Sequence, residues 1–142
     1  VEGTPMDFRT PTEIVKKVDY NFDQIKNATG YDHNWCLNTY KDGKGDDKTV
    51  CASLYSPTSG ILLEVFTNEP GIQVYTGNFQ GTGIPGKHGI KYPKHVSVCF
   101  ESQKYPDSPT KVAQGVKDWT DATLKPGEKY YSHLAYKFSV KK

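Results

Sequence analysis

Glu101 is the residue in this sequence that is best suited to acid–base chemistry. Residues 96–101 read Val-Ser-Val-Cys-Phe-Glu, and this alternation predicts a β-strand that turns Ser97, Cys99 and Glu101 to one face. A carboxylate that neighbouring strands shield from water has a raised pKa, which suits a general base at neutral pH. A Glu in solvent at a strand end is the more common arrangement, so the pattern alone leaves both interpretations open.

Asp32 and Gln73 are two further polar residues on predicted strands. Asp32 shares a strand face with Asn34 in residues 31–37, and Gln73 shares one with Tyr75 in residues 72–79. Asp32 could instead close a turn by accepting a hydrogen bond from its own backbone. Gln73 could be a core amide that neighbouring strands satisfy. A functional and a structural role are both open for each residue.

The elements that would position these residues are predominantly strands. Residues 50–55 and 61–67 flank a Ser-Pro-Thr-Ser-Gly turn and predict a β-hairpin. The second of these runs is apolar on both faces apart from Glu64, as expected of a central strand. A last strand is predicted over residues 130–140, where apolar and other residues alternate. We therefore expect an all-β chain.

The remaining segments predict connectors and turns. Residues 1–15 are irregular, with one short helical turn expected to end at Val18, and residues 41–48 predict an exposed turn. Residues 105–109 predict a second irregular segment. The glycine spacing in residues 81–86 matches a dinucleotide-binding loop, but the surrounding Pro and Gly discourage the helix which that loop requires. We expect a flexible loop there.

Composition limits the classes of partner. The 142 residues have a formal net charge of +2 and scattered Lys, so neither nucleic acid nor a membrane surface is expected as a partner. No secretory leader and no membrane-spanning apolar run is recognisable. The three cysteines, Cys36, Cys51 and Cys99, lack metal-ligand spacing and predict free thiols in a reducing compartment. We expect a soluble, cytoplasmic protein without a bound metal.

Three segments, in order and at fitting intervals, carry a resemblance that covers essentially the whole chain. The segments are residues 30–34 (GYDHN), 69–78 (EPGIQVYTGN) and 99–107 (CFESQKYPD). Together they resemble the aldose 1-epimerases, also called galactose mutarotases, and the Leu-Lys-Pro-Gly-Glu of residues 124–128 fits the ending of that family.

The resemblance implies a large antiparallel β-sandwich, the galactose mutarotase-like supersandwich, of which residues 1–142 form the C-terminal portion, about half or less, of a single domain. The family's catalytic acid, a His, and a second substrate-binding His lie in the earlier portion. No histidine of this chain stands in their context: His33, His88, His95 and His133. A sandwich cut in this way exposes strand faces and edges, so we expect a fragment, or one chain of an enzyme completed by an N-terminal polypeptide.

The activity implied by the resemblance is the interconversion of the α and β anomers of hexoses such as galactose and glucose. Glu101 is the expected general base, and Asp32 and Gln73 are the expected substrate-binding residues. One base and one acid suffice, so no cofactor is expected. We expect the isolated chain to be inactive. The alternative is a non-catalytic carbohydrate-binding or regulatory module derived from the same family.

Overall fold

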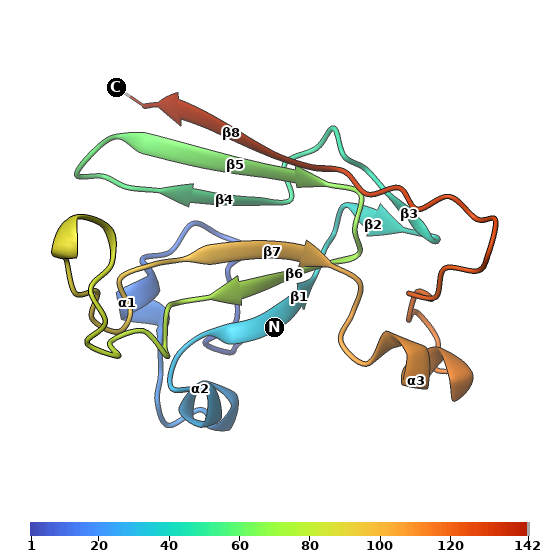
Figure 1. The fold of residues 1–142 in the computed structure, drawn as a ribbon, viewed down its shortest axis with the longest axis horizontal. Helices are drawn as coiled ribbons and strands as arrows, with labels where there is room; N and C mark the ends of the chain where they lie inside the picture. Colours follow the sequence, from blue (N-terminus) through green and yellow to red (C-terminus); the bar gives the residue numbers. More distant parts are fainter. Residues whose placement is uncertain (142) are drawn as a thin grey trace. The chain divides into compact units, whose positions relative to one another are not determined.

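The computed structural model describes residues 1–141, which form mostly antiparallel strands with few helices (Figure 1). The helices are α1 (Ile14–Lys17), α2 (Asp23–Ala28) and α3 (Ser108–Ala113), with a 3₁₀ turn at Lys87–Gly89. The strands are β1 (Asp32–Cys36), β2 (Tyr40–Lys41), β3 (Lys44–Gly45), β4 (Ala52–Tyr55), β5 (Ile61–Thr67), β6 (Gly71–Tyr75), β7 (Cys99–Gln103) and β8 (Leu134–Val140).

The chain forms two compact units, which are described separately. The first comprises Val1–His33 and Val74–Cys99. The second comprises Asn34–Gln73 and the chain from Phe100 onward. The boundaries between the units fall within β1, β6 and β7, so each of these strands contributes residues to both.

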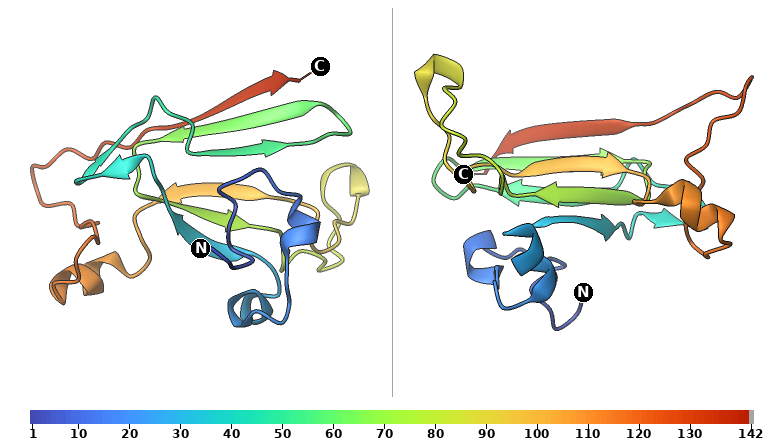
Figure 2. Two further views of the ribbon diagram at one scale, coloured as in Figure 1. Left: turned by 180° about the vertical axis from the view of Figure 1, so that it is seen from behind. Right: turned by 60° about the horizontal axis from the view of Figure 1, so that its bottom comes forward.

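A three-stranded sheet in the order β4-β5-β8 belongs to the second unit, with β5 in the middle (Figures 1 and 2). Val65 of β5 lies opposite Ala52 of β4 and Tyr136 of β8, and its side chain is fully buried. The predicted hairpin and the predicted central strand are both confirmed. Alternating apolar residues specify this register, because a slip of one residue would turn Val65 out of the core.

The outer strand β8 exposes an apolar stripe. Every second residue of β8 lies on the sheet face that Val65 of β5 shares. On this face, Phe138 and Val140 are 68% and 69% exposed. Ile61, which lies opposite Val140, is also exposed. Residues 1–141 therefore leave much of this apolar stripe uncovered. The other exposed members of the stripe are Leu134 and Tyr136.

A second sheet has the order β1-β6-β7, with β6 in the middle. The sequence predicted that the strand bearing Glu101 would begin at Val96, but β7 begins at Cys99. His95 adopts a left-handed backbone conformation, with φ of 61°, and its N–H donates to the carbonyl of Gly77. This turn keeps residues 96–98 irregular, so the predicted first half of the strand is wrong.

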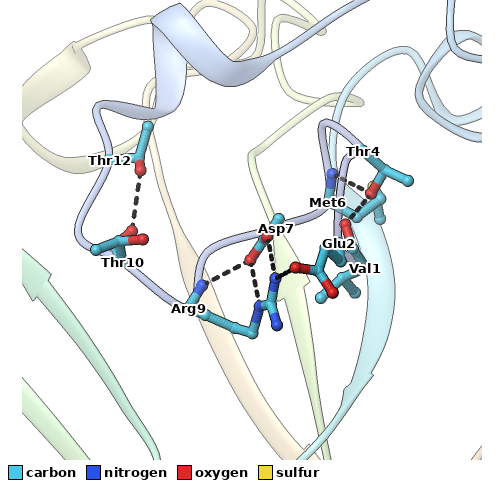
Figure 3. Close-up of polar contacts among 8 residues, drawn as sticks. All are labelled: Val1, Glu2, Thr4, Met6, Asp7, Arg9, Thr10 and Thr12. Atoms are coloured by element: carbon cyan, nitrogen blue, oxygen red, sulfur yellow. Dashed lines mark hydrogen bonds and ion pairs between the residues drawn. The ribbon is translucent and has the colours of Figure 1, made fainter.

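The N-terminal segment is a packed part of the first unit and not a simple connector. The Tyr31 hydroxyl donates to the Pro5 carbonyl at 2.9 Å, and the Tyr31 ring meets the edge of Phe8. Figure 3 shows that Asp7 accepts hydrogen bonds from the backbone and the guanidinium of Arg9. These bonds hold the pKa of Asp7 well below its usual range.

Asn78 lies at the centre of the first unit and is fully buried. Its Nδ2 donates to the carbonyls of Ala28 and Tyr31, both at 2.9 Å, and its Oδ1 accepts from the Thr76 hydroxyl at 2.7 Å. A Cβ on Gly30 would lie 2.3 Å from this Oδ1, so only glycine fits there. The amide thus joins the end of α2 to the start of β1 and the end of β6.

Two of the helices were not predicted from the sequence. The helix α2 buries Ile25, and α3 begins after Asp107, which has a left-handed conformation, with Pro109 in its first turn. The Ser108 hydroxyl donates to the Thr120 carbonyl and fixes this start. The short turn α1 was predicted. Within residues 1–141, no helix is long and apolar enough to cross a membrane.

Candidate functional site

One face of the β1-β6-β7 sheet is polar within the second unit. The Gln103 Nε2 donates to Asn34 Oδ1 at 3.2 Å, which joins β7 to β1. Because β6 lies between these strands, the hydrogen bond passes over β6. A Cβ on Gly71 would lie 2.4 Å from Asn34 Oδ1, so the Asn34 amide lies directly on this glycine. These three residues therefore mark one face of the sheet.

Gln73 and Glu101 lie on the same face. Gln73 follows Gly71 by two residues in β6, and Glu101 precedes Gln103 by two in β7. Because strand side chains alternate with a period of two, each shares the face of its neighbour. The two strands are adjacent and run in opposite directions (Figure 1). The fold therefore brings these two predicted residues to one polar face of neighbouring strands.

The carboxylate of Glu101 faces solvent. Glu101 is exposed, and none of the described residues forms an ion pair or hydrogen bond with its side chain. The sequence predicted a carboxylate that neighbouring strands shield from water, and residues 1–141 do not supply that shielding. Its acceptor oxygens are correspondingly available to a ligand.

Asp32 belongs to the first unit and is half-buried. It begins β1, and its backbone N–H donates to Nδ1 of His33 at 3.0 Å. Asp32 thus lies in a strand, and the role of its side chain stays a prediction. Gln73 is also half-buried, and its side-chain role stays a prediction.

Charged and aromatic contacts fix the adjoining ends of β6 and β7. Glu69 precedes β6 and is buried, and Lys104 follows β7. Their side chains form an ion pair at 2.9 Å. Burial, with a smaller contribution from Cys36, raises the pKa of Tyr105 to about 12. The rings of Tyr105 and Trp119 pack edge to face, with their centroids 5.4 Å apart. Loss of Lys104 would leave the buried Glu69 carboxylate unpaired, which is destabilising, so the pair holds the two strand ends together.

Sequence reasoning missed the hydrogen bond between Asn34 and Gln103. Alternation alone assigns Gln103 to the face of Glu101 and Asn34 to that of Asp32. It does not say that the two strands flank β6 with a glycine between them. A glycine two residues before Gln73 was the available signal, because it leaves room for a side chain to cross the strand.

An open hollow of about 380 Å³ lies elsewhere in the second unit. Neither Gln73 nor Glu101 lines it. It combines two aromatic rings with acidic, basic and amide side chains, which the sequence did not single out. The lining residues are Tyr40, Gly43, Lys44, Gly45, Asp47, Asn68, Lys104 and Tyr131.

The histidines occupy varied environments. His88 and His95 are exposed, whereas Nδ1 of His133 lies 3.2 Å from Asp47 and His33 accepts from the backbone of Asp32. Among residues 1–141, no group of three or more His, Cys, Asp or Glu side chains could hold a metal ion.

Known proteins match nearly the whole chain. A family model described as aldose 1-epimerase matches residues 1–137. The galactose mutarotase of Mus musculus is 40% identical over 141 residues, which are 99% of this chain and 36% of that protein. The aldose 1-epimerase of Escherichia coli is 36% identical over 140 residues, which are 97% of this chain and 37% of that protein. The chain thus spans little more than a third of the length of these relatives.

A solved structure shows the same fold. The crystal structure of the GalM/aldose epimerase homologue from C. elegans matches with a TM-score of 0.75 and 24% sequence identity. The match covers 99% of this chain and 38% of the other. It confirms the antiparallel, sandwich-like β fold that the sequence resemblance implied.

Proposed function

The chain belongs to the aldose 1-epimerase family, and we propose that it forms the C-terminal portion of an enzyme that interconverts the α and β anomers of hexoses such as galactose and glucose. The observation that carries this proposal is the position of Glu101 beside Gln73. Both lie on one polar face of adjacent strands, and the Glu101 carboxylate is not engaged by any described residue. A free carboxylate next to an amide suits a sugar ligand, because the amide donates and accepts while the carboxylate accepts.

The chemistry needs one proton acceptor and one proton donor. Glu101 removes the proton of the C1 hydroxyl while an acid protonates the ring oxygen, and the bond between C1 and the ring oxygen breaks. The open-chain aldehyde rotates about C1–C2, and the reverse steps close the ring with the hydroxyl on the other face. Positioned acid–base groups of this kind contribute roughly 10²–10⁴-fold each.

Three side chains of this chain have separate roles in the proposed reaction. Glu101 is the general base, Gln73 orients the ring by donating to and accepting from its hydroxyls, and Asp32 accepts from other hydroxyls. No histidine of this chain is assigned the acid role. We assign it to a histidine in the N-terminal portion of the enzyme, which this chain does not contain.

A companion N-terminal polypeptide of the same enzyme would complete the site. The chain spans 36% of the mouse relative, and its β8 face leaves Phe138 and Val140 largely exposed. Covering such a stripe is favourable at about 25 cal/mol per Å² of apolar surface. We therefore expect the isolated 142-residue chain to be inactive. The proposed partners are thus this N-terminal polypeptide and the monosaccharide substrate.

The cysteines support a reducing compartment such as the cytoplasm. Cys36, Cys51 and Cys99 are free thiols, and Cys36 is exposed. Exposed thiols persist where glutathione and thioredoxin keep them reduced. Recovery of unmodified thiols from the natural protein, by mass after alkylation without reductant, would agree with this location.

Polarimetry tests the proposed function. Freshly dissolved α-galactose or α-glucose is followed with the natural enzyme that carries this chain, and the expected result is equilibration faster than in buffer. Glu101→Gln should abolish the acceleration. Glu64→Gln is the matched control, because Glu64 also lies on a strand of the second unit but pairs with Lys137. Sugar binding without acceleration would favour a non-catalytic carbohydrate-binding module.

A further inference from the structure

The Asn34–Gln103 hydrogen bond crosses β6 at its glycine. Asn34 comes from β1 and Gln103 from β7, the two outer strands of the sheet. A Cβ at Gly71 would lie 2.4 Å from Asn34 Oδ1 and 3.0 Å from its Nδ2, so any other residue would displace the amide. The hydrogen bond therefore requires a residue without a side chain at position 71 of β6.

This hydrogen bond lies next to the two predicted site residues of the second unit. Gln73 is the next residue on this face of β6 after Gly71, and Glu101 is the next on β7 before Gln103. The strands run in opposite directions (Figure 1), so stepping away from the hydrogen bond on both strands leads to Gln73 and Glu101 together. Whatever fixes Gly71 against Gln103 also fixes the carboxylate against the amide.

The side chains of Asn34 and Gln103 are held mainly by this one hydrogen bond. Among the described residues, Asn34 and Gln103 make side-chain hydrogen bonds only to each other. Both are half-buried, whereas Glu101 beside them is exposed. A bond of this kind contributes modestly to stability, and its geometric effect falls on the strand that carries the carboxylate.

We propose that Asn34 and Gln103 are positioning residues for Glu101, because their hydrogen bond over Gly71 restrains the twist of β7, whose spacing from β6 the backbone hydrogen bonds already set. This inference rests on the proposed function. Displacement of a reacting group by about 1 Å can cost roughly 100-fold in rate. Gln73 binds the ring in either case, so loss of the hydrogen bond should lower kcat and leave KM nearly unchanged.

The test compares variants on both faces of β7 in the natural enzyme that carries this chain. Gln103→Met removes the donor at nearly constant volume, and Asn34→Ser removes the acceptor from the other strand. Ser102→Ala is the matched control, since Ser102 bonds to Thr67 on the opposite face at 3.0 Å. Polarimetric kcat and KM, and the denaturation midpoint, are measured for each variant that retains the native circular dichroism spectrum.

The expected result is a fall in kcat of about tenfold for Gln103→Met and for Asn34→Ser, with KM within about twofold. The double variant should lose little more than either single variant, because both act through one bond. Ser102→Ala should leave kcat within about twofold although it also removes a hydrogen bond from β7. A purely structural role would instead lower the stability of all three and spare kcat.

The two proposals fail in distinguishable ways. No acceleration by the unaltered enzyme would overturn the proposed function and the positioning role together. Acceleration that Glu101→Gln abolishes but Gln103→Met and Asn34→Ser leave intact would overturn the positioning role alone. A rise in KM at constant kcat would also overturn it, because the pair would then bind substrate directly.

Discussion

Replacing Asn78 by alanine tests whether one buried amide holds the first unit together. The side chain makes hydrogen bonds to Ala28, Tyr31 and Thr76, which lie in three segments of the unit. The Tyr31 carbonyl also accepts from the Thr76 backbone, so it keeps a partner in the variant. The Ala28 carbonyl lies at the end of α2 and would lose its side-chain donor.

The expected loss follows from these contacts. Three hydrogen bonds at about 1 kcal/mol each amount to a loss of about 3 kcal/mol in the free energy of unfolding. Because Asn78 is fully buried, water does not readily replace the amide. Asn78→Asp should be worse at neutral pH, since its carboxylate would face two carbonyl oxygens. That variant should regain stability as the pH falls and the carboxyl binds a proton.

Urea denaturation followed by circular dichroism gives the measurement. Asn27→Ala is the matched control, because Asn27 is exposed on α2 beside Ala28 and should change the free energy by less than about 0.5 kcal/mol. A loss below about 1 kcal/mol for Asn78→Ala would mean that water replaces the three bonds. The reasoning from burial would then be wrong.

Three other changes test separate parts of the fold. Burial raises the pKa of Tyr31 to about 12 from a reference of 10.0. The stability that the neutral Tyr31 hydroxyl contributes should therefore be full below pH 10 and disappear as the pH rises to about 12. Tyr31→Phe should remove this pH dependence from the denaturation midpoints. Lys137→Ala should cost at most about 0.5 kcal/mol, and only in dilute salt, because the Lys137 side chain of its cross-strand pair with Glu64 lies largely in solvent. An equal loss in concentrated salt would contradict this. Gly71→Ala should cost about 1–3 kcal/mol in urea denaturation, since its Cβ would meet Asn34 at 2.4 Å, and a neutral result would contradict the close approach.

The strands were predictable where alternation and turn residues agree. The hairpin β4-β5 and the central place of β5 followed from the apolar pattern around the turn at residues 56–60. The start of β7 was not predictable, because the left-handed conformation of His95 depends on a hydrogen bond to Gly77, eighteen residues earlier. The helix α2 was missed for a similar reason, since buried Ile25 and the distant Asn78 stabilise a segment that is polar in sequence.

The candidate site, like the fold, was predictable from the sequence only in part. Period-two alternation correctly assigned Gln73 and Glu101 to single faces of their strands, but strand order decides which faces meet. The Asn34–Gln103 contact requires β6 between β1 and β7, and no local pattern encodes that order. The solvent exposure of Glu101 likewise depends on which elements cover the sheet, so sequence alternation alone predicted shielding that residues 1–141 do not supply.

The exposure of Glu101 and the apolar stripe on β8 both agree with the proposal that an N-terminal polypeptide completes this site. A general base gains from a site that excludes water, and the described residues leave this carboxylate in solvent. The same residues leave Phe138 and Val140 without a covering layer, although each would favour burial by about 1.5–3 kcal/mol. A polypeptide that supplied the other two thirds of the family's length could cover apolar surface and bring an acid to the sugar. The free energy of burying the stripe would then favour assembly of the site, and catalysis would depend on that assembly.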